Sequence, residues 1–351
     1  MKKIIFILVL IVAFVYADEY LPLFEQYVNN DVQEENINIL SESEPEESQE
    51  TVSYSISEEN LLELIGKHPE QLMGLFGEPD RVDLSAYGYD WWVYKKGLES
   101  YMQVGVQGDR VVSVYAIGNN TNAAPFAVGQ TRDEVTKQIT LKNEVELTEE
   151  NNYYRFRLNN DDMKMRPLVK YGEVYIQLYF DQFLDTLSSI RVIDAPTLLK
   201  QRPYEIVYRG QLPEAPVLQS DDWKQIEEGA AQQILDITNV IRQRHKLPLL
   251  EWDQETANVA YLHSKEMSDL QYFAHDSPVE GDLGNRLQKG DVMYQRAGEN
   301  IASNYPDGIA AVEGWLNSEG HRKALLNKEF THLGVGVYEK YYTQNFITPL
   351  N

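Results

Sequence analysis

The sequence predicts an α+β protein with two successive globular parts behind an N-terminal extension. From residue 57 to 196, apolar residues at helical spacing alternate with short strand-like runs. A long helix with one apolar face then opens the part from 221 to 351, and two strand-like runs close it. The 351 residues, of which 43% are hydrophobic, are enough for two domains of ordinary size with cores.

Residues 1–17 have the features of a secretory signal peptide. Lys2 and Lys3 precede an apolar run from Ile4 to Val15, and Ala17 offers a small-residue cleavage site. A membrane span needs about 20 apolar residues, so this shorter run favours a cleaved signal over an uncleaved anchor. With either reading, we expect most of the chain to lie outside the cytoplasm. If the signal is cleaved, we expect no transmembrane segment to remain.

Residues 18–56 are expected to form an acidic, disordered spacer. Fourteen Asp and Glu and no Lys or Arg occur between Asp18 and Glu63, which accounts for more than half of the net charge of −24. Such a stretch buries too little apolar surface to offset the entropy lost on ordering. The acidic balance of the whole chain also argues against nucleic acid as a partner.

The chain contains no cysteine. Disulfides, thiolate catalysis and cysteine-based metal sites are therefore excluded. Secreted animal proteins of this size usually carry disulfides, so their absence suggests an exported bacterial protein.

Residues 57–196 are expected to hold two helix-plus-antiparallel-strands repeats. The first helix spans about 61–75 and ends at Gly77, and the second opens at Val128. The expected strands are 86–94, 101–107, 110–117, 153–158, 174–180 and 187–193. The aromatic residues between 87 and 94 are expected to pack within a sheet, with an exposed patch for a partner as the alternative. Three prolines favour a linker over 197–220.

The last part, 221–351, carries a series of short motifs in a fixed order. Expected helices cover 221–244 and 254–270, and expected strands cover 333–339 and 341–347. Between and around them stand NVIR, LPLLEWD, AYLHSKEM, YFAHDSP, GDLGNR, AGENIA, WLNSEGHR, GVGV and YTQNF.

This succession resembles the bacterial branch of the CAP superfamily, which includes cysteine-rich secretory proteins, antigen 5 and pathogenesis-related-1. The resemblance covers nearly the whole C-terminal part and implies an α-β-α sandwich (the CAP, or SCP, fold). The segments YGYDWWVY, VQGDRVVSVYAIG and YFDQF of the preceding part resemble the CAP-associated N-terminal domain found in Firmicutes.

Three ionisable residues of the C-terminal part stand where packing does not demand them. His275 and Glu299 fall outside any apolar period, in what we expect to be loops, and His321 follows a glycine. The resemblance implies that they line a central cleft and, as two imidazoles and a carboxylate, could hold Zn²⁺ or Ca²⁺. The family's second acid is replaced by Ser318, which leaves the set incomplete. Asn300 is expected to fix the Glu299 loop beside this cleft.

Three functions fit these residues, and an enzyme is the less favoured class. The first is a secreted or cell-surface binding module whose cleft holds a cation, a small hydrophobic or lipid ligand, or a peptide. The second is an extracellular hydrolase with Glu299 as general base. The third is a structural protein of the envelope or spore surface, whose cleft is vestigial. Independently of these functions, Glu299 and the two histidines could form a buried hydrogen-bond network that fixes the Glu299 loop against the segment that begins at Trp315.

Overall fold

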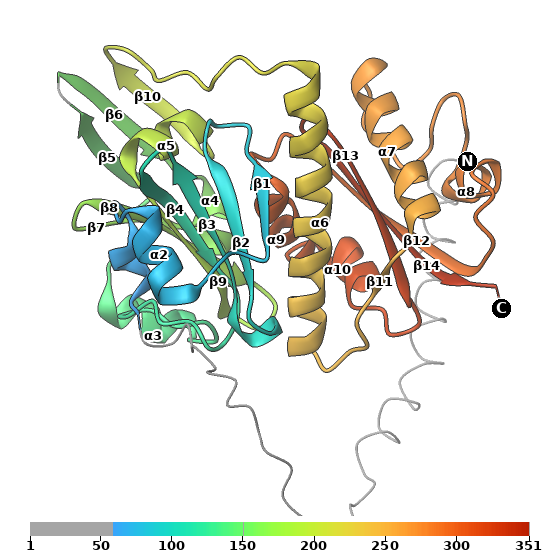
Figure 1. Ribbon diagram of the computed structural model, residues 1–351, viewed down its shortest axis with the longest axis horizontal. Helices are drawn as coiled ribbons and strands as arrows, with labels where there is room; N and C mark the ends of the chain where they lie inside the picture. The colour runs from blue at the N-terminus through green and yellow to red at the C-terminus, as the bar shows by residue number, and fades with distance from the viewer. Residues whose placement is uncertain (1–58, 150, 351) are drawn as a thin grey trace, which may run out of the picture. The chain divides into compact units, whose positions relative to one another are not determined.

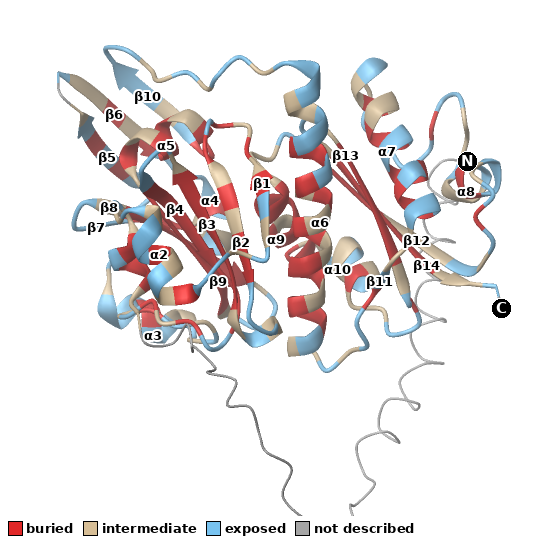
Figure 2. Ribbon diagram, in the orientation of Figure 1, coloured by how far each residue is buried: buried red, intermediate tan, exposed pale blue. Residues whose placement is uncertain are grey.

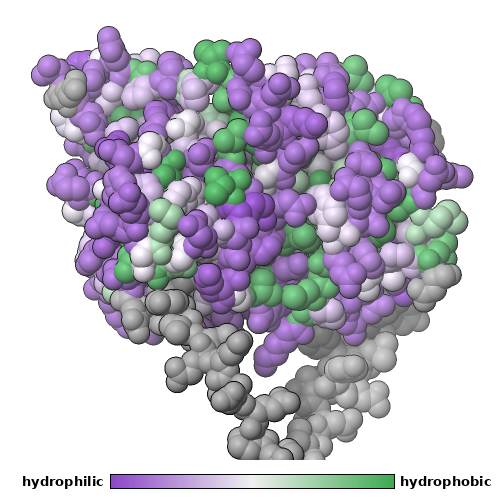
Figure 3. All heavy atoms as spheres, in the orientation of Figure 1, coloured by the Kyte–Doolittle hydropathy of each residue, from purple (hydrophilic) through white to green (hydrophobic). Residues whose placement is uncertain are grey.

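The structure, a computed structural model, describes residues 59–149 and 151–350. The signal peptide and the acidic spacer lie outside these residues, so both stay predictions. Within the described part of the chain, we find no helix that is both long enough and apolar enough to cross a membrane. Charged and polar side chains cover most of the face seen in Figure 3, and apolar side chains are scattered among them.

The N-terminal part is built on one seven-stranded antiparallel sheet with the order β1-β2-β3-β4-β9-β8-β7 (Figure 1). Its strands are β1 (Arg81–Leu84), β2 (Asp90–Lys95), β3 (Tyr101–Gln107), β4 (Arg110–Ala116), β7 (Leu168–Tyr171), β8 (Val174–Asp181) and β9 (Thr186–Ile193). Strand β4 pairs with β9 in the middle. Strands from both predicted repeats therefore join in one continuous sheet, although the predicted strand 153–158 is not part of it.

Short capped helices precede the strands of each half. They are η1 (Leu61–Leu64) and α2 (Pro69–Phe76) in the first half, and α3 (Arg132–Gln138) and α4 (Asn160–Met165) in the second. At the start of α3, the Thr131 hydroxyl accepts a hydrogen bond from the Glu134 backbone, and the Glu134 carboxylate accepts one from the Thr131 backbone. The predicted α+β order of helix and antiparallel strands is confirmed in both halves.

A second, three-stranded sheet has the order β10-β6-β5. Its strands are β5 (Glu144–Glu149), β6 (Asn152–Arg157) and β10 (Glu205–Arg209), and α5 (Ala195–Gln201) precedes β10. Most of α5 and all of β10 lie within 197–220, the stretch interpreted as a linker. Only 210–219 run without regular structure to the next helix.

The C-terminal part is an α-β-α sandwich, as the motif order implied. Its sheet has the order β11-β13-β14-β12. The strands are β11 (Glu251–Trp252), β12 (Tyr294–Ser303), β13 (His332–Tyr338) and β14 (Tyr341–Pro349). Helices α6 (Ser220–Arg244), α9 (Gly308–Leu316) and α10 (Glu319–Leu325) cover one face, and α7 (Gln254–Asp269) and α8 (Leu283–Lys289) cover the other (Figure 1).

The GVGV motif on β13 explains how α7 approaches the sheet. Val335 and Val337 point into the core beneath α6, and the two glycines alternate with them toward α7. A Cβ atom at Gly336 would lie 1.9 Å from the backbone nitrogen of Tyr261, and one at Gly334 would lie 2.2 Å from that of Ala257. Only glycine permits this contact between strand and helix backbones.

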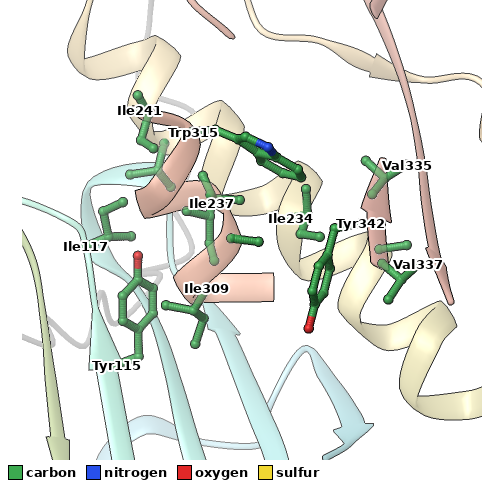
Figure 4. Close-up of a cluster of buried hydrophobic side chains, with 14 of the residues drawn as sticks. Tyr115, Ile117, Ile234, Ile237, Ile241, Ile309, Trp315, Val335, Val337 and Tyr342 are labelled. Carbon is green, nitrogen blue, oxygen red and sulfur yellow. The ribbon is translucent and has the colours of Figure 1, made fainter. Parts of the chain in front are cut away.

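The two parts share one hydrophobic core. Figure 4 shows Tyr115 and Ile117, at and just after the end of β4, beside side chains of helices α6 and α9. Side chains of strands β13 and β14 belong to the same cluster and lie farther along α6. The labelled residues of this cluster are Tyr115, Ile117, Ile234, Ile237, Ile241, Ile309, Trp315, Val335, Val337 and Tyr342. Buried residues follow α6 along most of its length (Figure 2), because this helix packs against both parts. Tyr89 and Trp91 are buried in the same cluster, so the partner that covers these aromatic residues is the C-terminal part of the same chain.

Buried ion pairs accompany this core. Arg191 on β9 is fully buried and lies 2.9 Å from the carboxylate of Asp307, the N-cap of α9. Asp236 on α6 accepts hydrogen bonds from Arg81 at 3.2 Å and from Lys95 at 2.8 Å. Because each unpaired charge would be costly in such surroundings, these pairs favour one relative placement of the two parts.

Candidate functional site

The Glu299 carboxylate is the centre of a polar network in the C-terminal part. Glu299 lies in β12, not in the loop that the sequence suggested, and its side chain is 3% exposed. The prediction missed this strand because YQRAGENIAS has little apolar alternation, and its position depends on pairing with β14. The strand fixes the carboxylate against the loop between α7 and α8.

Both carboxylate oxygens of Glu299 have partners. Arg286 on α8 donates to Oε2 at 2.5 Å, and Nδ1 of His275 lies 3.0 Å from Oε1. The Arg286 guanidinium is 4% exposed and also donates to the backbone oxygens of His275 and Gly281. Arg286 therefore compensates the buried negative charge and holds the loop that carries His275.

The His275 side chain is 54% exposed, although its Nδ1 contacts the buried Glu299 carboxylate. The hydrogen bond to Glu299 raises the pKa of His275 above its usual value, against the effect of partial burial. Since Nδ1 faces Glu299, Nε2 is the ring nitrogen available to a ligand. The ring is thereby held in one orientation.

His321, on α10, is the second imidazole of the cleft. Its ring centre lies 6.4 Å from that of His275. Burial lowers the pKa of His321, and the neighbouring His275 lowers it further. The two imidazoles are thus shifted in opposite directions, so there is a pH range in which His275 is charged and His321 is neutral.

Asn300 and Ser318 have structural roles that differ from the roles of the ionisable residues. Asn300 is fully buried and donates to the backbone oxygen of His321 at 3.1 Å, so it fixes α10. Ser318 is the N-cap of α10, and its side chain makes no capping hydrogen bond. The adjacent Glu319 pairs with Lys323 at an exposed position and does not complete the set of acids.

The turn between α9 and α10, which carries Ser318 and leads to His321, is held by the N-terminal part. The Asn317 side chain accepts from the backbone nitrogen of Gln182 and donates to the backbone oxygen of Phe180, both at 2.8 Å. Arg322 forms an ion pair with Asp181 at 2.8 Å. The N-terminal part therefore helps to position one of the two imidazoles.

A second layer of polar residues stands behind His275. Nε2 of His263, which is buried on α7, lies 3.1 Å from the backbone oxygen of Ala274 and 4.0 Å from the Glu299 carboxylate. One turn along, Glu266 accepts hydrogen bonds from Tyr272 and Ser277, both at 2.8 Å. Glu266 was not predicted as a site residue, although its i,i+3 spacing from His263 places both on one helix face.

The Ser277 hydroxyl is fully engaged. It donates to Glu266 and accepts from the backbone nitrogens of Val279 and Glu280, at 3.0 and 2.7 Å. These contacts close the turn after His275. Ser277 is therefore not positioned as a nucleophile beside an imidazole.

A pocket of about 530 Å³ lies between α7 and α8 and shares residues with this network. His263, Glu266 and Arg286 form its polar wall, and Val259, Leu262 and Leu270 supply apolar surface. Leu262 and Leu270 are 63% and 52% exposed, although both are large apolar residues. Such a pocket is of the size that small ligands occupy.

His275, Glu299 and His321 do not, as arranged, fit a divalent cation. The described residues include no group of three or more His, Asp or Glu side chains suited to hold one. The chemical reason lies at Glu299, where a guanidinium already occupies one carboxylate oxygen and an imidazole the other. A cation at this carboxylate would have to displace Arg286 or face its positive charge. Metal binding remains an untested prediction.

Comparisons with known proteins agree with the motif order. Residues 65–204 match the family described as CAP-associated N-terminal, and residues 235–348 match the cysteine-rich secretory protein family. The uncharacterized membrane protein YlbC of Bacillus subtilis is 51% identical over 311 residues, which cover 88% of this chain and 90% of YlbC.

Two solved structures are similar over most of the chain. An extracellular protein from Bacillus anthracis that contains an SCP domain is 47% identical, with a TM-score of 0.80, over 88% of this chain and 100% of that one. A cysteine-rich secretory protein from Staphylococcus aureus is 27% identical, with a TM-score of 0.70, over 83% of this chain and 96% of that one.

Proposed function

Because the chain belongs to the cysteine-rich secretory protein (CAP) family, we propose that it is a secreted or cell-surface binding module for a peptide ligand. His275 and His321 would contact the ligand, at one of its carboxylate groups. The single observation that carries this proposal is the fixed orientation of His275, whose Nδ1 faces the buried Glu299 while its side chain is 54% exposed.

The chemistry of the two imidazoles fits a carboxylate. Protonated His275 would donate a charge-assisted hydrogen bond from Nε2, and its raised pKa keeps it protonated to a higher pH than usual. Neutral His321 would supply a second ring nitrogen, since its ring centre lies 6.4 Å from that of His275. Binding would therefore be stronger below the pKa of His275 than above it.

A calorimetric titration with three probes tests this proposal. The probes are a short peptide with a free carboxyl terminus, a fatty acid and Zn²⁺, each added to the parent, to His275→Ala and to His332→Ala. His332 lies 3.6 Å from Glu251, away from the cleft, and serves as the matched control. We expect the peptide to bind better at about pH 6 than at about pH 8.5. The affinity should fall more than about tenfold in His275→Ala and stay unchanged in His332→Ala, since charge-assisted hydrogen bonds are the strong ones.

Other results would replace the proposal. Heat from Zn²⁺ that disappears in His275→Ala would support the cation reading, and fatty-acid binding without peptide binding would support a lipid in the pocket between α7 and α8. An amidated peptide that binds as well as the free acid would exclude a role for the carboxylate.

A hydrolase is the second candidate, favoured by the 3.0 Å contact between His275 and Glu299, since a carboxylate that orients an imidazole is a common general-base arrangement. The engaged Ser277 hydroxyl removes the nearest nucleophile, so this enzyme would have to activate water. Release of a labelled peptide by the parent, lost in Glu299→Gln, would establish the hydrolase. Binding without release would support the module.

Export is proposed from the apolar run Ile4–Val15 and from the extracellular type of the family. YlbC is named a membrane protein, which suits the uncleaved anchor, the alternative to a cleaved signal. The mass of the protein recovered from culture medium and from the cell fraction separates the two. A start at Asp18 in the medium indicates cleavage, and a full-length chain in the membrane fraction indicates an anchor.

A further inference from the structure

A cavity lies at one edge of the four-stranded sheet of the C-terminal part, between the two helical layers. Helices α6 and α7 cover opposite faces of this sheet, and Figure 1 shows β13 between them. Strand β11 pairs with β13 only at His332 and Leu333. Beyond this short pairing, no strand of the described residues covers the outer edge of β13, and residues 335–337 border a cavity of about 560 Å³. A cavity of this size is typical of sites for small ligands.

The side chain of Glu227, on α6, lines this cavity although Glu227 is only 7% exposed. Its Oε1 atom accepts a hydrogen bond from the backbone nitrogen of Glu339 at 2.8 Å. Its Oε2 atom has no hydrogen-bond partner among the described residues, yet this atom is not sealed from solvent. One oxygen of a buried carboxylate is therefore available to a ligand in the cavity.

The Glu227 carboxylate also lacks a counter-ion, since no Lys, Arg or His nitrogen of the described chain lies within 4 Å of it. Lys265 is the cation that influences Glu227 most, and it is paired with Asp269. Lys224 also lines the cavity, but it is exposed and forms no ion pair with Glu227 or with the neighbouring Glu228. Burial raises the pKa of Glu227, and the charge of Glu228 adds to this effect. A cation supplied by a ligand would compensate the buried charge.

Two aromatic side chains border the same cavity. Trp252, on β11, donates a hydrogen bond from its indole nitrogen to Gln254 at 3.1 Å. Tyr261, on α7, packs edge-on against Tyr338, with ring centres 6.0 Å apart. The face of an aromatic ring attracts an ammonium group, and Ala257 of α7 adds apolar surface. The lining therefore suits a cation that has N–H donors and an alkyl chain.

We propose that this cavity binds a primary alkylammonium group, which is held by the Glu227 carboxylate. The ammonium group donates a charge-assisted hydrogen bond to Oε2 and lies near Trp252 and Tyr261, and its alkyl chain contacts Ala257. A free alkylamine and the lysine side chain of another polypeptide present this same chemistry. The cavity shares no residue with the network around Glu299, so this second site is independent of the function proposed for the His275 cleft.

The test is an NMR titration of the full chain, in which the indole N–H signal of Trp252 reports on the cavity. Two probes, cadaverine and acetyl-lysine methylamide, carry a primary ammonium group. Pentanol lacks the charge, and pentyltrimethylammonium keeps the charge but has no N–H donor. We expect saturable binding of at least one of the two amines, and at least about tenfold weaker binding of the other two probes, because hydrogen bonds to charged groups are the strong ones. The amine that binds more tightly identifies the source of the group, a free amine or a lysine side chain.

Two variants and two matched controls identify the residues that bind the amine. Glu227→Gln removes the charge and keeps an oxygen for the backbone nitrogen of Glu339, so the affinity should fall at least about tenfold. Glu319→Gln makes the same change at an exposed position on α10 and should change the affinity less than about twofold. Tyr261→Leu should lower the affinity about two- to fivefold, whereas Tyr261→Phe keeps the aromatic face and should leave it unchanged.

Three results would overturn the proposal. The first is the absence of saturable binding by both amines. The second is an affinity that survives Glu227→Gln. The third is binding of pentanol or pentyltrimethylammonium as tight as that of the amines, which would leave Oε2 without a hydrogen-bonding role. Circular dichroism of Glu227→Gln checks that lost affinity is not lost folding. If this variant does not fold, the four probes and the comparison of Tyr261→Leu with Tyr261→Phe still decide the question in the folded protein.

Discussion

Replacement of Arg286 by methionine should destabilise the protein far more than loss of an ordinary surface ion pair. The Glu299 carboxylate is 3% exposed, and Arg286, which is 4% exposed, pairs with it at 2.5 Å. Removal of one member of a buried pair costs about 3–5 kcal/mol, because the other charge stays buried and uncompensated. The backbone oxygens of His275 and Gly281 would also lose donors, at about 1 kcal/mol each.

The assay is urea unfolding of the parent, of Arg286→Met, of Glu299→Gln and of the double variant. Arg296→Met is the matched control, since Arg296 and Glu329 lie 3.6 Å apart and are 58% and 47% exposed. Such surface pairs contribute about 0.2–1 kcal/mol. We expect the double variant to be more stable than the sum of the single changes predicts, by about 1 kcal/mol or more. Additive changes, or a cost for Arg286→Met no larger than that of the control, would refute the role given to Arg286.

Two other predictions concern the same part of the chain. Glu299→Gln should bring the raised pKa of His275 down toward its ordinary value, and an NMR titration of the ring would detect this change. In the parent, the contact with Glu299 stabilises the folded protein fully below the ordinary histidine pKa. This stabilisation is lost as the pH rises through the raised pKa of His275. Gly336→Ala should cost about 1–3 kcal/mol in urea unfolding, because its Cβ would meet the Tyr261 backbone, whereas Gly320→Ala, which meets nothing within 4 Å, should be neutral or slightly stabilising. An unchanged His275 pKa, or equal effects of the two glycine variants, would contradict these expectations.

Elements with strong local patterns were predictable, and those that depend on partners were not. The central strands β3, β4, β8 and β9 are rich in β-branched and aromatic residues, and their predicted bounds agree with the structure to within a residue. The edge strands β5, β7 and β10 were missed. Their sequences are short or highly charged, as EVELTE in β5 shows, and pairing with a neighbouring strand defines them.

The same distinction applies to the site. The sequence indicated His275, Glu299 and His321 as residues without a packing role. In the structure, His275 contacts Glu299, and its ring centre lies 6.4 Å from that of His321. The ion pair between Arg286 and Glu299 joins a short helix to a strand that had not been predicted, so no local pattern indicates it. Arg286 is thus a partner of the carboxylate that the sequence did not indicate, beside the His275 imidazole that the same carboxylate positions.

The N-terminal part belongs to the framework of the cleft and is more than an attached module. Asn317 and Arg322 flank the turn that leads to His321, and their partners are Phe180, Asp181 and Gln182 at the end of β8. The shared hydrophobic core and the buried pair of Arg191 with Asp307 fix the same relative placement.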